Sequence, residues 1–232
     1  MALRKNLFSR LGNYFIEIVI IIIGISLSFA LSDWEKKKSD QVDYQNYLKR
    51  LQQDIRIDSV QMANDKRLYL NKIKAVDLIF KYHEGFSQDS ILLLGEAQNA
   101  LSNYVQFLPN NNTFQVLSST GEFKIFRNDS LVSELFHLYR FDYAFIEMMG
   151  KEADGARTQR LEPYLIQNIY YEDELTFPIV RTDIAKVIRD RTFRNICLDY
   201  KQSSYSAFNS YRIALERLAR IDRIIEEELE EY

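Results

Sequence analysis

Side chains suited to catalysis are few in this 232-residue chain. His83 and His137 are the only histidines, and neither stands in a His-x-x-x-His or Glu-x-x-His pair of the kind that binds metal on a helix. Cys197 is the only cysteine, so an intrachain disulfide and a zinc site of paired cysteines are both excluded. The sequence also lacks the phosphate loop of NTPases and the Gly-x-Ser-x-Gly turn of hydrolases. We therefore expect no enzyme, no cofactor and no metal.

One cluster of hydroxyls and amides remains, in the stretch SSTGEFKIFRNDS over residues 118–130. Such groups at a helix junction can bind an anion or another polar ligand. The same residue types also end and begin helices. We favour the structural role, in which Ser119 and Gly121 form a turn that stops one helix and Asn128 caps the next.

Glu17 is the only acid between Tyr14 and Leu31, the most apolar part of the stretch YFIEIVIIIIGISLSFALSDW. From Tyr14 to Leu31 a helix covers roughly 27 Å, which is just enough to cross the hydrocarbon of a bilayer. Residues 18–23 are apolar on every side of such a helix, whereas the core helix of a soluble domain has a polar stripe. Tyr14 and Trp34 stand at the two ends, where amphipathic rings prefer the membrane interface. The sequence thus predicts a transmembrane helix over residues 14–32.

A cleavable signal peptide is the alternative, because Ser28-Phe29-Ala30 resembles a small-x-small cleavage site. The apolar run is long for a signal peptide, and we favour a retained anchor. Basic residues stand on both sides of the span, so charge indicates the orientation only weakly. A short basic tail over residues 1–13 is easily kept in the cytoplasm, and we expect residues 33–232 to form an extracytoplasmic domain.

Glu17, Ile21, Gly24 and Ser28 share one face of the predicted span. Small residues four positions apart allow close approach of a second helix, which makes this face a candidate oligomer contact. Glu17 lies one turn inside the span, and we favour an arrangement in which its carboxylate reaches the membrane interface. The alternative is a functional role, as a buried polar contact with another helix or as a proton site.

The rest of the chain has the pattern of long helices with few breaks. No Gly or Pro occurs between Asp33 and His83, and we expect a polar hinge over residues 32–41 followed by a helix over 40–83. Gly85 is a candidate C-cap, residues 88–90 can start a helix that carries Tyr104, and residues 109–112 form the clearest loop. We also expect a helix capped by Asn112 or Thr113, and a helix from Leu131 that bends or ends near residues 150–155. Pro163 stands where the first turn of a further helix tolerates proline, and residues 172–178 form a loop.

The last segment repeats small and apolar residues at alternating spacings of three and four. Its stripe consists of Phe193, Ile196 or Cys197, Tyr200, Ser204, Ala207, Tyr211, Ala214, Leu218, Ile221 and Ile225. Such a seam needs a partner helix, and the 40–83 helix is the obvious one. An antiparallel intrachain bundle is favoured over an intermolecular coiled coil. The predicted fold class is therefore all-α, with a single transmembrane helix followed by an antiparallel bundle of long, coiled-coil-like helices.

The span together with TFQVLSSTGEFKIFRNDSLVSELFHLY over residues 113–139 resembles a family of single-pass bacterial membrane proteins, found mainly in Bacteroidota and catalogued as domain of unknown function 6090. The resemblance covers nearly the whole chain, and Ser119-x-Gly121 followed by Asn128 is its most distinctive part. The family more commonly has Gly-Glu-Ile where this chain has Phe15-Ile16-Glu17. The resemblance implies a bacterial inner membrane and a helical periplasmic domain, and it implies no activity.

A formal charge of −3 offers no basic excess to displace counterions from nucleic acid, which we exclude as a partner. We expect the partners to be the lipid bilayer and either further copies of this chain or another envelope protein. The expected function is that of a membrane-anchored interaction or scaffold protein. The alternatives are a sensor or transport-complex subunit that uses Glu17 in the membrane, and an enzyme whose site has no recognisable motif.

Overall fold

The computed structural model describes the backbone of residues 2–81, 97, 99–168 and 186–230, and the side chains among these from Glu17 onward. These residues form helices and connecting segments without strands, so the all-α prediction is confirmed. The chain divides into two compact units, Met1–Leu48 and Lys49–Tyr232, and helix α1 (Ala2–Lys81) contributes to both. The expected features at His83, Gly85, residues 88–90 and residues 172–178 lie outside the described residues.

The first unit is helical from Ala2 to Leu48. The hinge expected over residues 32–41 is therefore wrong. Its polar composition indicated a break, but Lys and Glu are good helix formers and this stretch contains neither Gly nor Pro. Polarity alone does not stop a helix when the backbone hydrogen bonds can continue.

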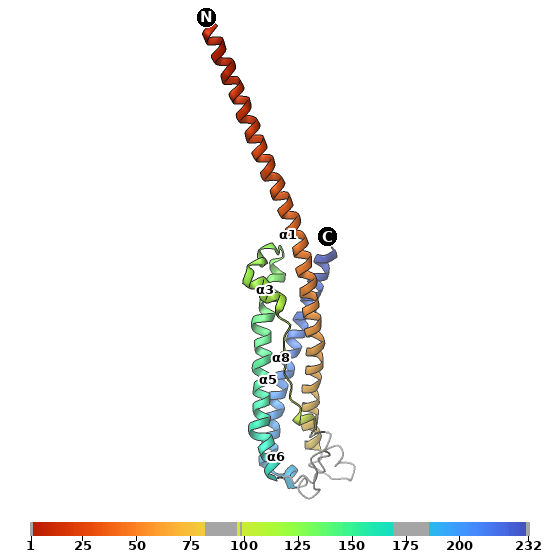
Figure 1. Ribbon diagram of the computed structural model, residues 1–232. Helices are drawn as coiled ribbons and strands as arrows, with labels where there is room; N and C mark the ends of the chain where they lie inside the picture. The colour runs from red at the N-terminus through yellow and green to blue at the C-terminus, as the bar shows by residue number, and fades with distance from the viewer. Residues whose placement is uncertain (1, 82–96, 98, 169–185, 231–232) are drawn as a thin grey trace. The chain divides into compact units, whose positions relative to one another are not determined.

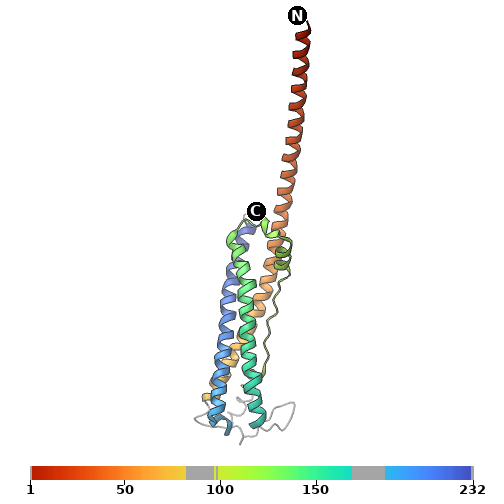
Figure 2. The ribbon, with the colours of Figure 1, turned by 90° about the vertical axis from the view of Figure 1, so that its left-hand side faces the viewer.

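The second unit is an antiparallel bundle, as the sequence predicts. Its long elements are residues 49–81 of α1, the helix α8 (Arg191–Glu230), and a column built from α4 (Asp129–His137), α5 (Tyr143–Ala156) and α6 (Glu162–Asn168) (Figures 1 and 2). Hydrogen bonds join Arg56 to Asp222 and Lys72 to Tyr200, so α8 runs antiparallel to α1. The ion pairs Arg217–Asp142 and Arg160–Asp199 show that α8 also runs antiparallel to the α4–α6 column.

The predicted stripe of α8 is the core of the bundle. Each of its positions is buried, with Cys197 taking the place for which Ile196 was the alternative. Ser203 and Ser210 are buried as well, because α8 packs against α5 in addition to α1 and so needs a wider buried face than a two-helix seam. Cys197 has no disulfide partner, and burial raises the pKa of its thiol to about 12.

The α4–α6 column is one continuous run of helix with two wide turns. The π-turns η3 (Leu138–Asp142) and η4 (Arg157–Leu161) join its three α-helices. The bend or end expected near residues 150–155 lies at the edge of that range, since α5 passes through Gly150 and Gly155 and ends at Ala156, where η4 follows. In η4 the Glu162 N–H donates to the Arg157 carbonyl just before Pro163, which has no N–H to donate.

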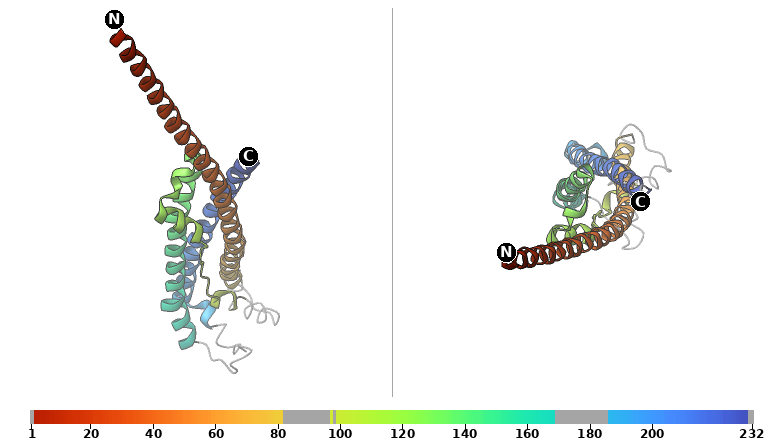
Figure 3. Two further views of the ribbon diagram at one scale, coloured as in Figure 1. Left: turned by 45° about the horizontal axis from the view of Figure 1, so that its top comes forward. Right: turned by 90° about the horizontal axis from the view of Figure 1, so that it is seen from above.

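The connection between α1 and this column contains an extended segment. Residues 97 and 99–102 are helical, residues 103–111 have no regular structure, and α3 (Asn112–Thr120) follows. The predicted helix therefore ends at Ser102, before Tyr104. In the second unit this segment runs along the bundle between α1 and α5, as Figures 1 and 3 show.

Helix α3 begins differently from the expectation. Asn111 takes the N-cap position and its side chain makes no capping hydrogen bond, so the predicted cap at Asn112 or Thr113 is wrong. The N–H of Thr113 donates instead to Oδ2 of Asp54 on α1, over 3.3 Å. An acceptor from another helix thus satisfies a free N–H at this helix start.

Candidate functional site

The apolar part of α1 is exposed on all its faces. The helical stretch Glu17–Lys81 contains an 18-residue window with a mean hydropathy of 1.8, none of which is buried. The side chains from Ile18 to Ile23 are each between 37 % and 63 % exposed. This helix is long and apolar enough to cross a membrane.

The predicted contact face lies within this exposed stretch. Glu17, Ile21, Gly24 and Ser28 are all exposed, and no atom lies within 4 Å of a methyl group placed on Gly24. The Ser28 hydroxyl donates to the Gly24 carbonyl over 3.0 Å, a bond within the helix that keeps this polar group satisfied in an apolar setting.

Of the two predicted interface anchors, Trp34 is described by the structure. Trp34 is 60 % exposed, and the Lys38 ammonium lies 5.5 Å from the centroid of its ring. This is the distance of a cation–π contact. The side chain of Tyr14 lies outside the described residues.

The turn motif stands at two helix ends. Gly121 ends α3 with φ +73°, a left-handed conformation that glycine adopts without steric cost. Ser119 donates its hydroxyl to the Val116 carbonyl over 3.1 Å. The side chain of Asn128 accepts from the Leu131 N–H over 3.0 Å and donates to Glu228 over 2.8 Å. These side chains hold the ends of α3 and α4, and their polar atoms bond to the protein itself.

A row of charged side chains inside the bundle escaped the sequence analysis. Asp58, Asp65 and Lys72 are seven residues apart on α1, and each is buried where a two-helix seam would have an apolar residue. A tyrosine of another helix meets each one. The tyrosine hydroxyl oxygens lie at 2.6 Å (Tyr143 to Asp58), 3.4 Å (Tyr211 to Asp65) and 3.0 Å (Tyr200 to Lys72) from the charged groups.

Two members of this row also hold the extended segment. The Nζ of Lys72 donates to the Asn103 carbonyl. At the other end, Oδ1 of Asp58 accepts from the N–H and from the side-chain amide of Asn110, each over 2.9 Å. Asn103 and Asn110 are thereby fixed to two points of α1.

Burial shifts the ionisation of this row. It raises the pKa of Asp58 above its usual value, against the opposing effect of the hydrogen bonds from Tyr143 and Asn110. Burial likewise raises the pKa of Asp65. It lowers the pKa of Lys72 to about 8, and the nearby Arg157 guanidinium acts in the same direction.

The signal for this row is present in the sequence. The apolar stripe of the 40–83 helix has gaps at positions 58, 65 and 72, and each gap holds a charged residue at the heptad spacing. Charged residues at seam positions with this period indicate partners inside the bundle. Which groups pair with these three residues depends on the register of the helices. The three tyrosines and the extended segment could therefore not be predicted as their partners.

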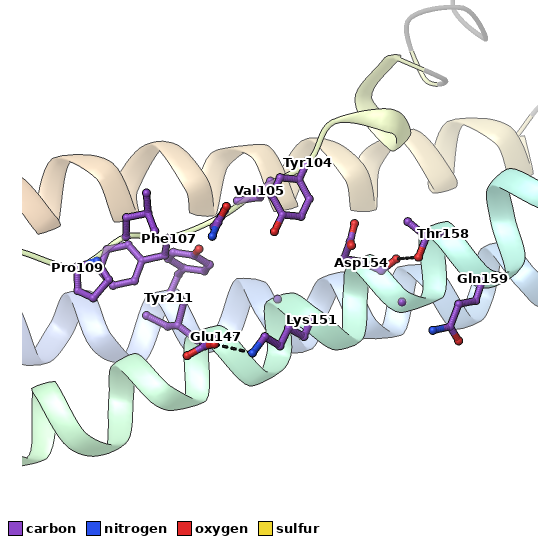
Figure 4. A pocket seen from close by; sticks show the side chains of 15 residues that line it. Tyr104, Val105, Phe107, Pro109, Glu147, Lys151, Asp154, Thr158, Gln159 and Tyr211 are labelled. Carbon is purple, nitrogen blue, oxygen red and sulfur yellow. Dashed lines mark hydrogen bonds and ion pairs between the residues drawn. The ribbon is translucent and has the colours of Figure 1, made fainter.

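A groove lies between the extended segment and α5 (Figure 4). Its main pocket has a volume of about 440 Å³ and is lined by all six residues from Tyr104 to Pro109, by one face of α5 continued by Thr158 and Gln159 of η4, and by Tyr211. A second pocket of about 340 Å³ shares Phe107, Pro109 and Glu147 with the first, so the two follow the segment one after the other. Volumes of this size suit small ligands or short stretches of chain.

The charged groups at the groove pair with one another. Lys151 and Glu147 form an ion pair of 2.5 Å, and Asp154 pairs with Arg157 over 2.6 Å. No group of three or more His, Cys, Asp or Glu side chains with metal-site geometry occurs in the described part of the chain. The groove can therefore offer contact area, main-chain groups and neutralised charges to a ligand.

Comparison of the chain with protein-family models, with curated proteins and with solved structures found no match.

Proposed function

We propose that this chain is a membrane-anchored helical-bundle protein of the bacterial cell envelope that acts by binding, as an oligomer or as a subunit of a complex. Its N-terminal tail is cytoplasmic, and the bundle is extracytoplasmic.

The observation that carries this proposal is the helix surface from Ile18 to Leu31, which is apolar and uncovered on every face. Exposing such a surface to water costs about 25 cal/mol for each Å² of apolar area. A lipid bilayer removes this cost, and a helix satisfies its own backbone hydrogen bonds there. Binding is favoured over catalysis because the polar groups around the groove are paired with each other instead of converging on a reacting atom.

Disulfide crosslinking in native membranes tests the oligomeric arrangement. Cys197 is the only native cysteine and is buried, so Cys197→Ser provides a cysteine-free background for Gly24→Cys and Ser28→Cys. We expect dimers on mild oxidation with both variants, because their side chains share the proposed contact face. Ile22→Cys, on another side of the helix, is the matched control and should remain monomeric.

A pull-down of the full-length protein from solubilised membranes tests the binding role. We expect a stoichiometric partner or a homo-oligomer. Recovery of monomer alone, together with the absence of crosslinks at both positions, would overturn the proposal.

A further inference from the structure

We infer that the outward face of α1 between Lys49 and Lys74 binds an acidic helix of a partner protein. The inference rests on the proposed binding role, and it adds the docking surface and the chemical class of the partner.

The exposed side of α1 in this range carries bases and no exposed acid. Its exposed cations are Lys49, Arg50, Arg56, Arg67 and Lys74. The acids of the same range are turned elsewhere, since Asp58 and Asp65 are buried, and Asp54 is half-buried and accepts from the Thr113 N–H. The chain as a whole has more acids than bases, so this excess of positive charge is local.

Most of these cations have no ion-pair partner. Within the described part of the chain only Arg56 of this group forms ion pairs, with two acids of α8. The other long helices differ, because their exposed faces carry the i,i+4 pairs Lys151–Glu147 on α5 and Arg212–Glu216 on α8. A helix face that only has to be solvated mixes both signs in this way. Unpaired cations along one face of α1 instead indicate a partner of the opposite charge.

The middle of this face is apolar. Ile57 and Val60 are 47 % and 65 % exposed. Together with polar side chains of α1 between Lys49 and Asn64, they line an open depression of about 790 Å³. Apolar side chains one turn apart, framed by longer polar ones, can receive an apolar side chain of a facing helix.

The spacing of the exposed residues fits a helix as the partner. An outer stripe of exposed residues recurs at alternating spacings of three and four along α1. It consists of Arg50, Gln53, Ile57, Val60, Asn64, Arg67, Asn71 and Lys74. This is the period at which two helices contact each other, and the outer stripe is about 36 Å long. A second helix lying along it covers the apolar and the basic positions together.

Charge argues against a second copy of the outer stripe as the occupant. Two parallel copies would place Arg50 against Arg50, and two antiparallel copies with Ile57 against Val60 would place Arg50 against Arg67. Like charges opposite each other weaken binding, whereas an acidic helix satisfies the same positions. Arg50 precedes Ile57 by seven residues and Arg67 follows Val60 by seven. The acids of the partner should therefore lie about two turns on either side of its apolar residues, whichever way it runs.

Photocrosslinking in cells of the native host tests this surface. p-Benzoylphenylalanine replaces Val60 in the full-length protein, and mass spectrometry identifies the residue to which it crosslinks. We expect a helical segment of another protein with Asp or Glu about two turns before and after the crosslinked residue. The same photoreactive residue in place of Phe145, which is exposed on α5, is the matched control and should not give this product.

Charge reversal tests the complementarity. Arg50→Glu combined with Arg67→Glu should lower the crosslink yield at position 60 about tenfold, because like charges then face each other. Replacing the two acids of the partner by Lys should restore the yield, which separates a lost charge match from a misfolded variant. Arg191→Glu combined with Arg223→Glu is the matched control, since both are exposed cations of α8, and it should leave the yield unchanged.

A crosslink from position 60 to lipid, to this chain or to a segment without the two acids would overturn the inference. The absence of any crosslink there, or an unchanged yield after charge reversal, would overturn it as well. If the pull-down nevertheless recovers a partner or an oligomer, the proposed function stands and only this surface is wrong. Recovery of neither is the separate result that removes the proposed function.

Discussion

The hydroxyl of Tyr143 on α5 donates a 2.6 Å hydrogen bond to Oδ2 of Asp58 on α1, in the interior of the bundle. The same carboxylate accepts two hydrogen bonds from Asn110. One buried side chain thus joins two helices and the extended segment. A buried carboxylate with several donors sets one alignment of its partners, because any other alignment leaves polar groups unpaired.

Removing this acceptor should destabilise the bundle. Asp58→Ala leaves the Tyr143 hydroxyl and the Asn110 N–H without their partner, and we expect a loss of about 1–3 kcal/mol in the free energy of unfolding. Asp58→Asn should cost less, since it keeps one acceptor oxygen and removes a charge that burial disfavours. Urea unfolding of the full-length protein in detergent, followed by circular dichroism, measures both.

Asp77→Ala is the matched control for this experiment. Asp77 lies on the same helix in an exposed ion pair with Lys201, and such pairs contribute about 0–1 kcal/mol. Equal losses for Asp58→Ala and Asp77→Ala would contradict the role given to the buried carboxylate.

Because Lys72 is buried, we expect the free energy of unfolding to depend on pH in the alkaline range. Its pKa is about 8 in the folded protein against 10.5 ordinarily, so the unfolded chain binds the proton more tightly. The stabilising contribution of the neutral amine is therefore fully present above pH 10.5 and is lost as the pH falls through about 8. The unfolding free energy of wild type relative to Lys72→Met should rise between these values, by at most about 1.4 kcal/mol per pH unit. A difference that does not change with pH would show that Lys72 titrates normally.

The glycines of the bundle should respond in opposite directions to alanine. At Gly150 and Gly155 the nearest atoms to an added methyl group lie at 3.5 and 3.8 Å, which is ordinary contact, and both residues are helical. Each substitution should stabilise the protein by about 0.5–1 kcal/mol because alanine is the better helix former.

Gly121→Ala should instead destabilise the protein by about 1–2 kcal/mol, since φ of +73° is strained for a residue with a Cβ atom. Thermal unfolding ranks the three variants. A lower melting temperature for Gly150→Ala or Gly155→Ala than for wild type would mean that α5 is more tightly packed at these positions than the distances indicate.

The sequence made the helical class and the α8 seam predictable because both depend on local spacing. Every stripe position from Phe193 to Ile225 is buried, since small and apolar residues at three and four can face only one way. The burial of Ser203 and Ser210 could not be predicted. It results from the packing of the α4–α6 column on α8, and a serine at these positions looks the same in the sequence as a serine on an exposed helix face.

Errors in the sequence analysis came from treating composition as a break signal. The polar stretch over residues 32–41 is helical because its Lys and Glu are good helix formers and it contains no Gly or Pro. Glycines 150 and 155 are helical because neighbouring residues support α5 at these weaker positions. The groove was not predictable at all. It depends on Lys72 and Asp58 drawing residues 103–110 out along α1, and these contacts connect parts of the chain that are far apart in sequence.

Intact-mass measurement of the protein after alkaline carbonate extraction of membranes shows whether Phe15 to Leu31 stays in the mature protein and holds it in a bilayer. We predict that the protein stays in the membrane pellet with a mass that includes residues 15–31. Release into the supernatant, or a mass that corresponds to a chain beginning after Ala30, would show that residues 15–31 are not a retained membrane anchor.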